Sequence, residues 1–423
     1  MAISSTVDEV GAMTEKLFET ALGIAAPWFV AGVDFKAAER RLTIRIDFAP
    51  GSRFVVPGMD GKHPVHDTVP KHYRHLNFFQ HECYLEVRTP RVKLPDGSVR
   101  QVEPDWAGKL AGFTLLFEAL VLVLCREMTF TGVAKLVNLS VYRVMAICSR
   151  YIDSALSQAD FSEVKDLAID ETSRARGQTY VTLAADAESR AVIFVTEGRG
   201  AETLERLAAD LRTHGGDPER VESVSIDMSA AFQGVTDNLP NARITFDKFH
   251  VIAHASAAID KRRRIEQKTD PSLKGMRWKL LKDYHRLSTE SRAELDRLLA
   301  ALTTKRTARA WVYREHLREI LDRKQINIAR AMLRQWCTNV MRSKVEPMKE
   351  VARLIRNHME GIVAWVQTRQ TNGFLEAING LFQAAKRKAR GYVRFSTIHT
   401  VIFLLVGKLD FSKLNPHVAT QPT

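Results

Sequence analysis

Two aspartates that follow short apolar runs are the residues whose types and spacing could do chemistry. Asp170 follows LAI and Asp227 follows VSI, so each is expected at the carboxyl end of a strand. Ligand sites of open α/β sheets gather at those ends, where two neighbouring carboxylates could bind one cation. Carboxylates with free water positions suit Mg²⁺ or Mn²⁺, and two such ions can clamp the attacking and leaving oxygens of a phosphoryl displacement. The pattern therefore predicts a divalent-metal site for phosphoryl transfer.

A third carboxylate is needed to close a two-metal site of this kind, and Glu376 is the candidate. It lies near the start of an amphipathic helical pattern, NGFLEAINGLFQAAKRKARGY. The polar face of that helix carries Asn379, and the other face carries Leu375, Ile378 and Phe382. We therefore expect Glu376 and Asn379 to face the aspartates.

Asp247 leaves the choice of the second aspartate open. It ends the run ITF in the same way that Asp227 ends VSI. Strand-terminal aspartates also serve as turn and helix-cap residues, which is a structural alternative for each of them. The residues alone do not decide between Asp227 and Asp247.

The elements that must position these acids alternate between strand and helix patterns. Strand patterns cover 164–170, 178–186, 190–198, 221–227 and 242–247, and helix patterns cover 201–213 and 229–239. This order predicts a mixed sheet with helices on its faces. Residues 250–360 carry almost no strand signal and are expected to be helical, with tryptophans that serve packing more readily than base stacking.

The segment before residue 105 is predicted to be a small β module. Strand patterns lie at 28–35, 41–48, 82–94 and 98–103, the last two around an Asp96-Gly97 turn. Residues 50–75 are rich in Pro, Gly and His and are expected to be irregular.

A helix-turn-helix is predicted at residues 129–152. A short apolar helix breaks before Ser140, a suitable N-cap for the next helix. That second helix could enter a major groove, with Tyr142, Arg143 and Arg150 as candidate DNA contacts. A plain helical hairpin is the alternative that the pattern leaves open.

Composition favours a basic cytosolic protein. Lys and Arg total 62 against 49 Asp and Glu, so a net charge of +13 attracts polyanions such as nucleic acid. Four isolated cysteines indicate reduced thiols rather than disulfides. The apolar run 113–125 is too short to span a bilayer, and no membrane partner is expected.

Two basic clusters are candidate DNA contacts. One includes Arg262 and Arg263, and the other consists of Lys386, Arg387 and Lys388 beside Glu376. Such cations would neutralise backbone phosphates. A solvated helix face is the alternative for the first cluster.

A series of motifs along the chain is similar to one known family. The motifs are AIDET (168–172), GQTYVTLAAD (177–186), SVSIDMSAAF (223–232), PNARITFDKFHVI (240–252) and TNGFLEAING with KRKARGY (371–392). Together with HLNFFQHECYLEVRTPRV, GFTLLFEAL and the helix-turn-helix, they resemble the DDE transposases of the ISL3 class of bacterial insertion sequences. Several ordered motifs in series are more specific than any single one.

This resemblance implies an RNase H-like catalytic fold with a large helical insertion. It assigns the three catalytic acids, which would bind two Mg²⁺ or Mn²⁺ ions, to Asp170, Asp227 and Glu376. Asp247 and His250 match a motif beside the site, with Asp247 as the fallback metal ligand. The segment after the glutamate matches at Asn379, Lys386 and Arg387.

The fold class expected from pattern and resemblance is a multidomain α+β protein. Its parts are a β module (1–105), a helix-turn-helix region (110–160), a first catalytic part (163–255), a helical insertion (256–360) and a second catalytic part (361–423). The ISL3 class usually carries paired zinc-binding cysteines near the N-terminus, but RFVVPGMDGKHPVHD has none, so zinc is not expected. A histidine-based site stays open at His63, His66, His72, His75, His81 and Cys83.

The function implied by the resemblance is DNA transposition. Such an enzyme binds the terminal inverted repeats of its element, cleaves a strand and joins it to target DNA. Holding two ends of double-stranded DNA implies a homo-oligomer, located with the nucleoid in the bacterial cytosol. The alternatives are a non-catalytic DNA-binding regulator derived from a transposase and a structure-selective nuclease.

Overall fold

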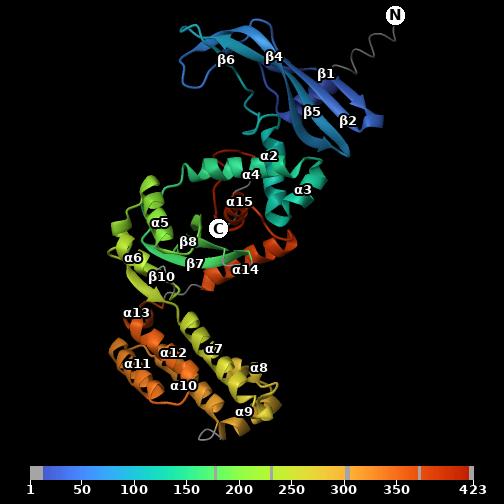
Figure 1. The fold of residues 1–423 in the computed structure, drawn as a ribbon. Helices are drawn as coiled ribbons and strands as arrows, with labels where there is room; N and C mark the ends of the chain where they lie inside the picture. The colour runs from blue at the N-terminus through green and yellow to red at the C-terminus, as the bar shows by residue number, and fades with distance from the viewer. Residues whose placement is uncertain (1–12, 176–178, 229–231, 301–304, 370–372, 419–423) are drawn as a thin grey trace, which may run out of the picture. The chain divides into compact units, whose positions relative to one another are not determined.

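The protein folds into two compact units, seen here in a computed structural model (Figure 1). The first unit is Met1–Gln158 with Ser396–Thr423, and the second is Ala159–Phe395. The structure describes residues 13–175, 179–228, 232–300, 305–369 and 373–418. Each unit contains one sheet together with helices.

The first unit contains a six-stranded sheet in which the predicted strand patterns are found. Its strands are β1 (Trp28–Lys36), β2 (Arg41–Phe48), β3 (Arg53–Val55), β4 (Lys62–Phe78), β5 (His81–Lys93) and β6 (Val99–Gln101). The order is β1-β2-β5-β4-β3, with β6 also paired to β5. The β2–β5 pair is parallel and the other pairs are antiparallel. The Asp96-Gly97 turn joins β5 to β6 as predicted, with Lys93 opposite Val99.

Strand β4 corrects the expectation that residues 50–75 are irregular. It contains Pro64 and Pro70, which cannot donate a backbone hydrogen bond. Their presence weakens the strand signal of the sequence. The short strand β3 pairs only with Lys62–Pro64, so most of β4 has β5 as its one partner. Pro70 lies on this free edge, where proline is tolerated because no neighbour needs its N–H.

The predicted helix-turn-helix is confirmed in the same unit. Its two helices are α3 (Phe130–Val137) and α4 (Val141–Leu156), and α2 (Leu115–Glu127) precedes them. Ser140 caps α4 through its side chain, which accepts a hydrogen bond from the Arg143 N–H. Helix α15 (Phe395–Val406) contacts α4, where the hydroxyls of Ser149 and Thr400 lie 2.9 Å apart. The C-terminal helix therefore covers one face of the second helix of the motif.

The second unit contains a five-stranded mixed sheet. Its strands are β7 (Asp166–Ala175), β8 (Thr179–Asp186), β9 (Val192–Glu197), β10 (Ser223–Ile226) and β11 (Arg243–Phe246). The order is β11-β10-β7-β8-β9; β7, β10 and β11 are parallel, and β8 is antiparallel to both of its neighbours, β7 and β9. Helices α5 (Ala201–Thr213) and α6 (Phe232–Asn238) fall between the strands in the predicted order.

Strand β7 separates an apolar side from a polar one. Leu167 and Ile169 are buried in the main apolar core, which also contains Leu204 of α5. Successive side chains of a strand point to opposite faces, so Asp170 points away from that core. The prediction that this strand ends at Asp170 is wrong, because pairing with β8 extends it to Ala175.

Residues beyond β11 form a helical bundle that continues the core (Figure 1). Its helices are α7 (Lys248–Glu266), α8 (Arg277–Leu281), α9 (Thr289–Ala300), α10 (Arg306–Asp322), α11 (Ile326–Met341), α12 (Glu346–Asn357) and α13 (Met359–Thr368). Helix α14 (Gly373–Lys388) then returns to the sheet and contacts β7. The long helix α7 therefore connects the sheet to the bundle, packing on α10 and α12.

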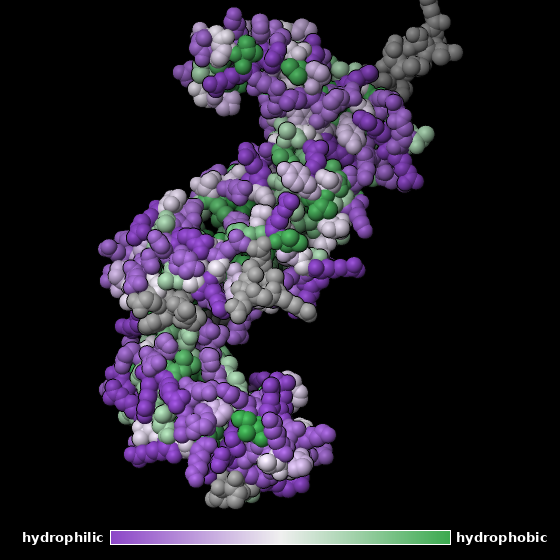
Figure 2. Space-filling model, viewed as in Figure 1, coloured by the Kyte–Doolittle hydropathy of each residue, from purple (hydrophilic) through white to green (hydrophobic). Residues whose placement is uncertain are grey.

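The visible surface is predominantly hydrophilic, with apolar side chains scattered across it (Figure 2). Within the described residues, no single helix is long and apolar enough to cross a membrane. Helices α3 and α4 meet those criteria only as a pair bent by 112°. All four cysteines are buried and unpaired, as predicted.

Candidate active site

The register of the parallel strands brings the first two predicted acids together. Ser223 pairs with Asp166, and Ser225 pairs with Ala168. Asp170 and Asp227 come two residues further along their strands, and the Asp227 carboxylate is near enough to raise the pKa of Asp170. The β10–β11 register, in which Ile226 faces Phe246, places Asp247 on the other side of Asp227.

Asp170 is a half-buried carboxylate whose hydrogen-bond partners are neutral donors. The Asn379 side-chain amide donates to its Oδ2 at 2.6 Å, and the Glu171 N–H donates to Oδ1 at 2.7 Å. Burial raises the pKa of Asp170, and the Asp227 carboxylate raises it further, against the opposing effects of the hydrogen bonds and of His250. The ionised form is therefore held at a cost that a bound cation would reduce.

Asp227 lies against His250, which α7 supplies. The His250 Nδ1 is 3.7 Å from the Asp227 Oδ1. His250 is placed by the start of α7, where the Asp247 side chain accepts from the Phe249 N–H at 2.8 Å. Asp247 is only 1% exposed, so the candidate fallback ligand serves as the helix cap in this structure.

Helix α14 lies along β7, as the predicted polar face requires. Asn379 contacts Asp170, and one turn later Gln383 donates to Thr172 at 2.9 Å. Lys386 then donates to the Ser173 carbonyl at 2.9 Å. Glu376 precedes Asn379 on this face by one turn and is exposed, while the predicted apolar face of α14 is buried.

The donors gathered here fit a hard divalent cation. Two buried polar atoms, Asn379 Oδ1 and His250 Nε2, have no hydrogen-bond partner among the described residues. An amide oxygen beside two carboxylates is the ligand chemistry of Mg²⁺ or Mn²⁺. In the described part of the chain, no three His, Cys, Asp or Glu side chains already lie close enough to hold a metal ion. The geometry therefore offers the pair Asp170 and Asp227, with Glu376 one helical turn from Asn379.

The candidate DNA contacts fall into exposed and structural residues. Tyr142 is 76% exposed at the start of α4, and Arg150 is also exposed. The Arg143 side chain instead donates to the Ala111 carbonyl at 3.1 Å and stacks over Phe113. Arg143 thus packs beside the motif, although it remains exposed.

The run after Lys261 contradicts its predicted role in part. Arg263 is 9% exposed and donates to Asp260, and the Arg262 side chain is similarly buried, 3.8 Å from Glu266. Successive helical residues point about 100° apart, so a basic run cannot present every member to solvent. Lys386 is bonded to β7, whereas Arg387 and Lys388 are exposed. The helical spacing of the basic residues along α7, rather than their density in the sequence, indicates which of them are exposed.

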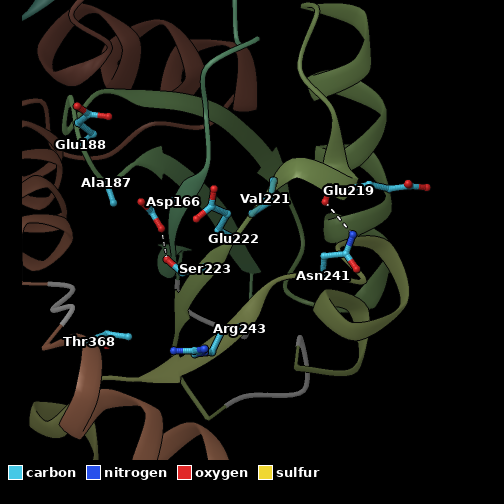
Figure 3. Close-up of a pocket in the computed structure, with 10 residues that line it drawn as sticks. All are labelled: Asp166, Ala187, Glu188, Glu219, Val221, Glu222, Ser223, Asn241, Arg243 and Thr368. Atoms are coloured by element: carbon cyan, nitrogen blue, oxygen red, sulfur yellow. Dashed lines mark hydrogen bonds between the residues drawn. The ribbon is translucent and has the colours of Figure 1, made fainter.

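A cavity of the second unit lies at the other end of its parallel strands (Figure 3). Its volume is about 690 Å³, and Asp166, Ser223 and Arg243 begin the strands that line it. Carboxylates of Glu188, Glu219 and Glu222 also line it. An acidic cavity repels a phosphate backbone, so this end of the sheet does not suit nucleic acid.

Comparison with known proteins defines the class of protein to which this fold and site belong. A sequence model described as "Transposase" matches residues 167–402, and one described as "Helix-turn-helix domain of transposase family ISL3" matches residues 102–152. The chain is 25% identical to the "Transposase for insertion sequence element IS1001" of Bordetella parapertussis, over 78% of this chain and 82% of that protein. It is 26% identical to the "Transposase for insertion sequence element IS1557" of Mycobacterium tuberculosis, over 76% of this chain and 78% of that protein.

The first match covers more than half of the chain and includes every element of the candidate site. The second covers α2, α3 and most of α4. The chain therefore belongs to the ISL3 family of insertion-sequence transposases.

Proposed function

We propose that this protein is a DDE-type transposase that cleaves and joins DNA with Asp170, Asp227 and Glu376. The observation that carries the proposal is the adjacency of Asp170 and Asp227 on parallel strands, beneath the helix that bears Glu376. In this proposal the three acids, which are distant in the chain, serve one two-metal phosphoryl-transfer site.

An RNase H-like fold for the second unit is part of this proposal. The strand order β9-β8-β7-β10-β11, with only β8 antiparallel to its central neighbour β7, supports it. So does the position of the bundle, because its helices are inserted between the second aspartate and the strand-covering helix α14. In this scheme the insertion separates Asp227 from Glu376 in sequence and returns the chain to the same surface.

Two Mg²⁺ or Mn²⁺ ions would be held by Asp170, Asp227 and Glu376. When bound, they supply Lewis-acid activation of water or a 3′-hydroxyl and neutralise charge at the attacked phosphate. Asn379 orients the Asp170 carboxylate through its amide hydrogen, and its free oxygen can accept from a water in the site. His250 lies against Asp227 with Nδ1 toward the carboxylate, and its Nε2 has no hydrogen-bond partner among the described residues.

The proposed reaction has two displacements. Water first hydrolyses a phosphodiester at the element end and releases a 3′-hydroxyl. That hydroxyl then attacks a phosphodiester of the target, forming one bond as the target strand breaks. Neither displacement needs a covalent bond between protein and DNA.

The first unit is proposed to recognise the ends of the element. The exposed start of α4, with Tyr142, offers side chains to a major groove, and the β module adds surface beside it. Arg387 and Lys388 of α14 would contact phosphates near the site. Two ends must be held at once, so we expect a homo-oligomer on double-stranded DNA, in the bacterial cytosol with the nucleoid.

A cleavage assay tests this function. The probe is a duplex that carries the inverted repeat flanking the coding region, incubated with the full chain and Mg²⁺. Wild type is expected to nick at the repeat boundary, while Asp170→Asn and Asp227→Asn bind the duplex equally well and do not cut it. Asp166→Asn, at the opposite end of β7, should retain cleavage. Wild type that binds without cutting would instead support a non-catalytic regulator, and cutting without regard to the repeat would support a nuclease.

A further inference from the structure

Helix α7 leads away from the candidate site and carries one continuous exposed stripe. The stripe begins at His250 and continues through His254, Ala257, Lys261 and Arg264. At about 100° per residue these positions lie within about 40° of His250 around the helix. His250 is partly buried against Asp227, and the four that follow are exposed. The opposite face packs into the core through Val251, Ala255 and Ile259.

The far end of the stripe opens into a basic groove between α7 and α8. The groove has a volume of about 640 Å³, and its charged lining consists of Asp260, Lys261, Arg264, Lys268 and Arg277. Four cations therefore face one carboxylate. The adjacent Trp278 is 62% exposed, and the Arg277 guanidinium lies 4.9 Å from its ring centroid. A polyanion is the ligand that this charge balance favours.

The groove is preorganised by its one acid. Asp260 is 6% exposed and accepts from Arg263 through Oδ1 and from Arg264 through Oδ2, the latter at 2.6 and 2.9 Å. The Arg277 guanidinium lies 3.7 Å from the same carboxylate. Lys261 is held across the groove rim by Glu350 of α12, at 2.9 Å. Fixed side chains lose less conformational entropy when they bind a phosphate than free ones.

We propose that this stripe and groove, the α7 track, bind the sugar-phosphate backbone of the same DNA duplex whose phosphodiester occupies the candidate site. The proposal rests on the proposed function and adds a second contact to it. Lys261 and Arg264 lie about 16 and 21 Å from His250 along the helix axis. Base pairs repeat every ~3.4 Å, so the contact falls about five to six base pairs from the cleaved bond.

The groove favours DNA over an acidic peptide because a duplex bound at the candidate site extends beyond it. A duplex that enters the site continues in a straight line over about 20 Å, because its persistence length is about 500 Å. The exposed alanines, Ala253 and Ala257, lie between the site and the cations. Their small side chains permit the close approach of a backbone along this part of the helix.

Neutral DNA linkages paired with a charge-removing variant test the α7 track. The groove variant is Lys261→Gln with Arg264→Gln and Lys268→Gln. Its matched control is Lys324→Gln with Arg334→Gln and Lys344→Gln, which removes the same charges from exposed positions outside the groove. Each protein is bound to the end duplex with native phosphates. The measurement is repeated with methylphosphonates about five to six base pairs from the cleaved bond, on one side and then on the other.

On the native duplex, the groove variant should bind about 10-fold more weakly than the control, with a salt slope smaller by about two to three. Neutral linkages on one side should weaken wild type and control, yet leave the groove variant unchanged. The α7 track would be overturned if the groove variant and the control bound the duplex equally well. It would also be overturned if the neutral linkages weakened binding of the groove variant as much as binding of the wild type. If wild type cleaves the duplex while either of these results is found, the track fails and the proposed function stands. Absence of both binding and cleavage by wild type overturns the two together.

Discussion

Two carboxylates of the second unit have opposite surroundings: half-buried Asp170 at the sheet and buried Asp260 in the helical bundle. Asp260 of α7 accepts from Arg263 and Arg264, and these guanidinium groups lower its pKa against the effect of burial. Asp170 of β7 has no lysine or arginine ion-pair partner among the described residues, and burial raises its pKa. Both carboxylates lose hydration on folding, but only the charge of Asp260 is balanced by neighbouring arginines.

This difference separates an acid that stabilises the structure from an acid available for chemistry. A buried charge without a counter-charge is costly, so it persists where a ligand or a reaction requires it. Glu118 of α2 marks the limit of this inference. It is fully buried and has no ion pair within the described part of the chain, yet the N–H groups of Lys109 and Leu110 and the Tyr151 hydroxyl all donate to it. The useful criterion is therefore an uncompensated acid beside polar atoms that still lack partners.

The largest loss of cleavage is expected from a change at Glu376. Glu376 is exposed, so it is compared with another exposed glutamate. Glu376→Gln removes a proposed metal ligand and should lower the cleavage rate at least about 10³-fold, equivalent to about 4 kcal/mol. The control is Glu360→Gln on α13. Glu360 is also exposed but forms an ion pair with Arg330 at 2.7 Å. Single-turnover cleavage should be unchanged by the control; an equal loss in both variants would contradict the assignment of Glu376.

The comparison also predicts opposite stability changes for the two aspartates. Asp260→Asn leaves Arg263 buried without its counter-charge and should lower the free energy of unfolding by about 3 kcal/mol. Asp170→Asn should leave it unchanged or raise it slightly at neutral pH. The reason is that folding raises the pKa of Asp170. Such a carboxyl makes the folded protein less stable as the pH rises above the pKa of the unfolded state, whereas the amide of Asn has no charge and no such cost.

Urea unfolding of the full chain with both variants measures these changes. The comparison predicts that Asp170→Asn abolishes cleavage without destabilising the protein, whereas Asp260→Asn destabilises it. A large destabilisation by Asp170→Asn would mean that Asp170 is a structural acid, and the distinction between the two carboxylates would be lost.

His75 of the first unit, outside the candidate active site, provides an independent test of how burial acts on an ionisable group. Burial lowers its pKa to about 4, helped by Arg74 and His417, while its Nδ1 lies 2.9 Å from the Thr114 hydroxyl. The unfolded state therefore binds a proton that the folded state rejects. Stability should be complete above pH ~6.5 and fall by up to about 3 kcal/mol as the pH decreases toward 4.

Unfolding curves between pH 4 and 7 check this expectation. His75→Gln should flatten the dependence, while His66→Gln, at an exposed position of the same strand, should not. DNA cleavage above pH 6.5 should be unaffected by either change. If His75→Gln abolished cleavage while the fold stayed intact, a buried uncharged histidine would need a functional explanation.

Local patterns predicted those elements whose side chains alternate clearly. The hairpin β1–β2 follows from strict alternation between Trp28 and Phe48, and the helix-turn-helix follows from its apolar spacing and the Ser140 cap. Asp170, Asp227 and Asn379 were likewise predictable as neighbours, because strand order and helix periodicity constrain them. What remains a prediction is their metal chemistry and the role of Glu376.

Non-local pairing explains what the sequence did not predict. β4 depends on its pairing with β5, which outweighs the local signal of Pro64 and Pro70. The length of β7 beyond Asp170 depends similarly on β8. The basic run on α7 was interpreted by charge density, whereas the surrounding helices decide that Arg263 is buried and Lys261 exposed. Packing partners distant in the chain therefore set the details that local residue types leave open.

The smallest effect separates the alignment of Asp170 from the packing of the helix that aligns it. The amide hydrogen bond from Asn379 lowers the pKa of Asp170, opposing burial. Asn379→Ala should therefore raise that pKa further, shift the acid limb of the cleavage profile to higher pH, and slow cleavage about 10-fold, or ~1.4 kcal/mol. Gln383→Ala removes the next contact of the same helix, to Thr172 and Ser173, without touching Asp170. If both variants slow cleavage equally and leave its pH profile unmoved, α14 acts only as a packed cover; a shift confined to Asn379→Ala means that the uncompensated acid is tuned by this one donor.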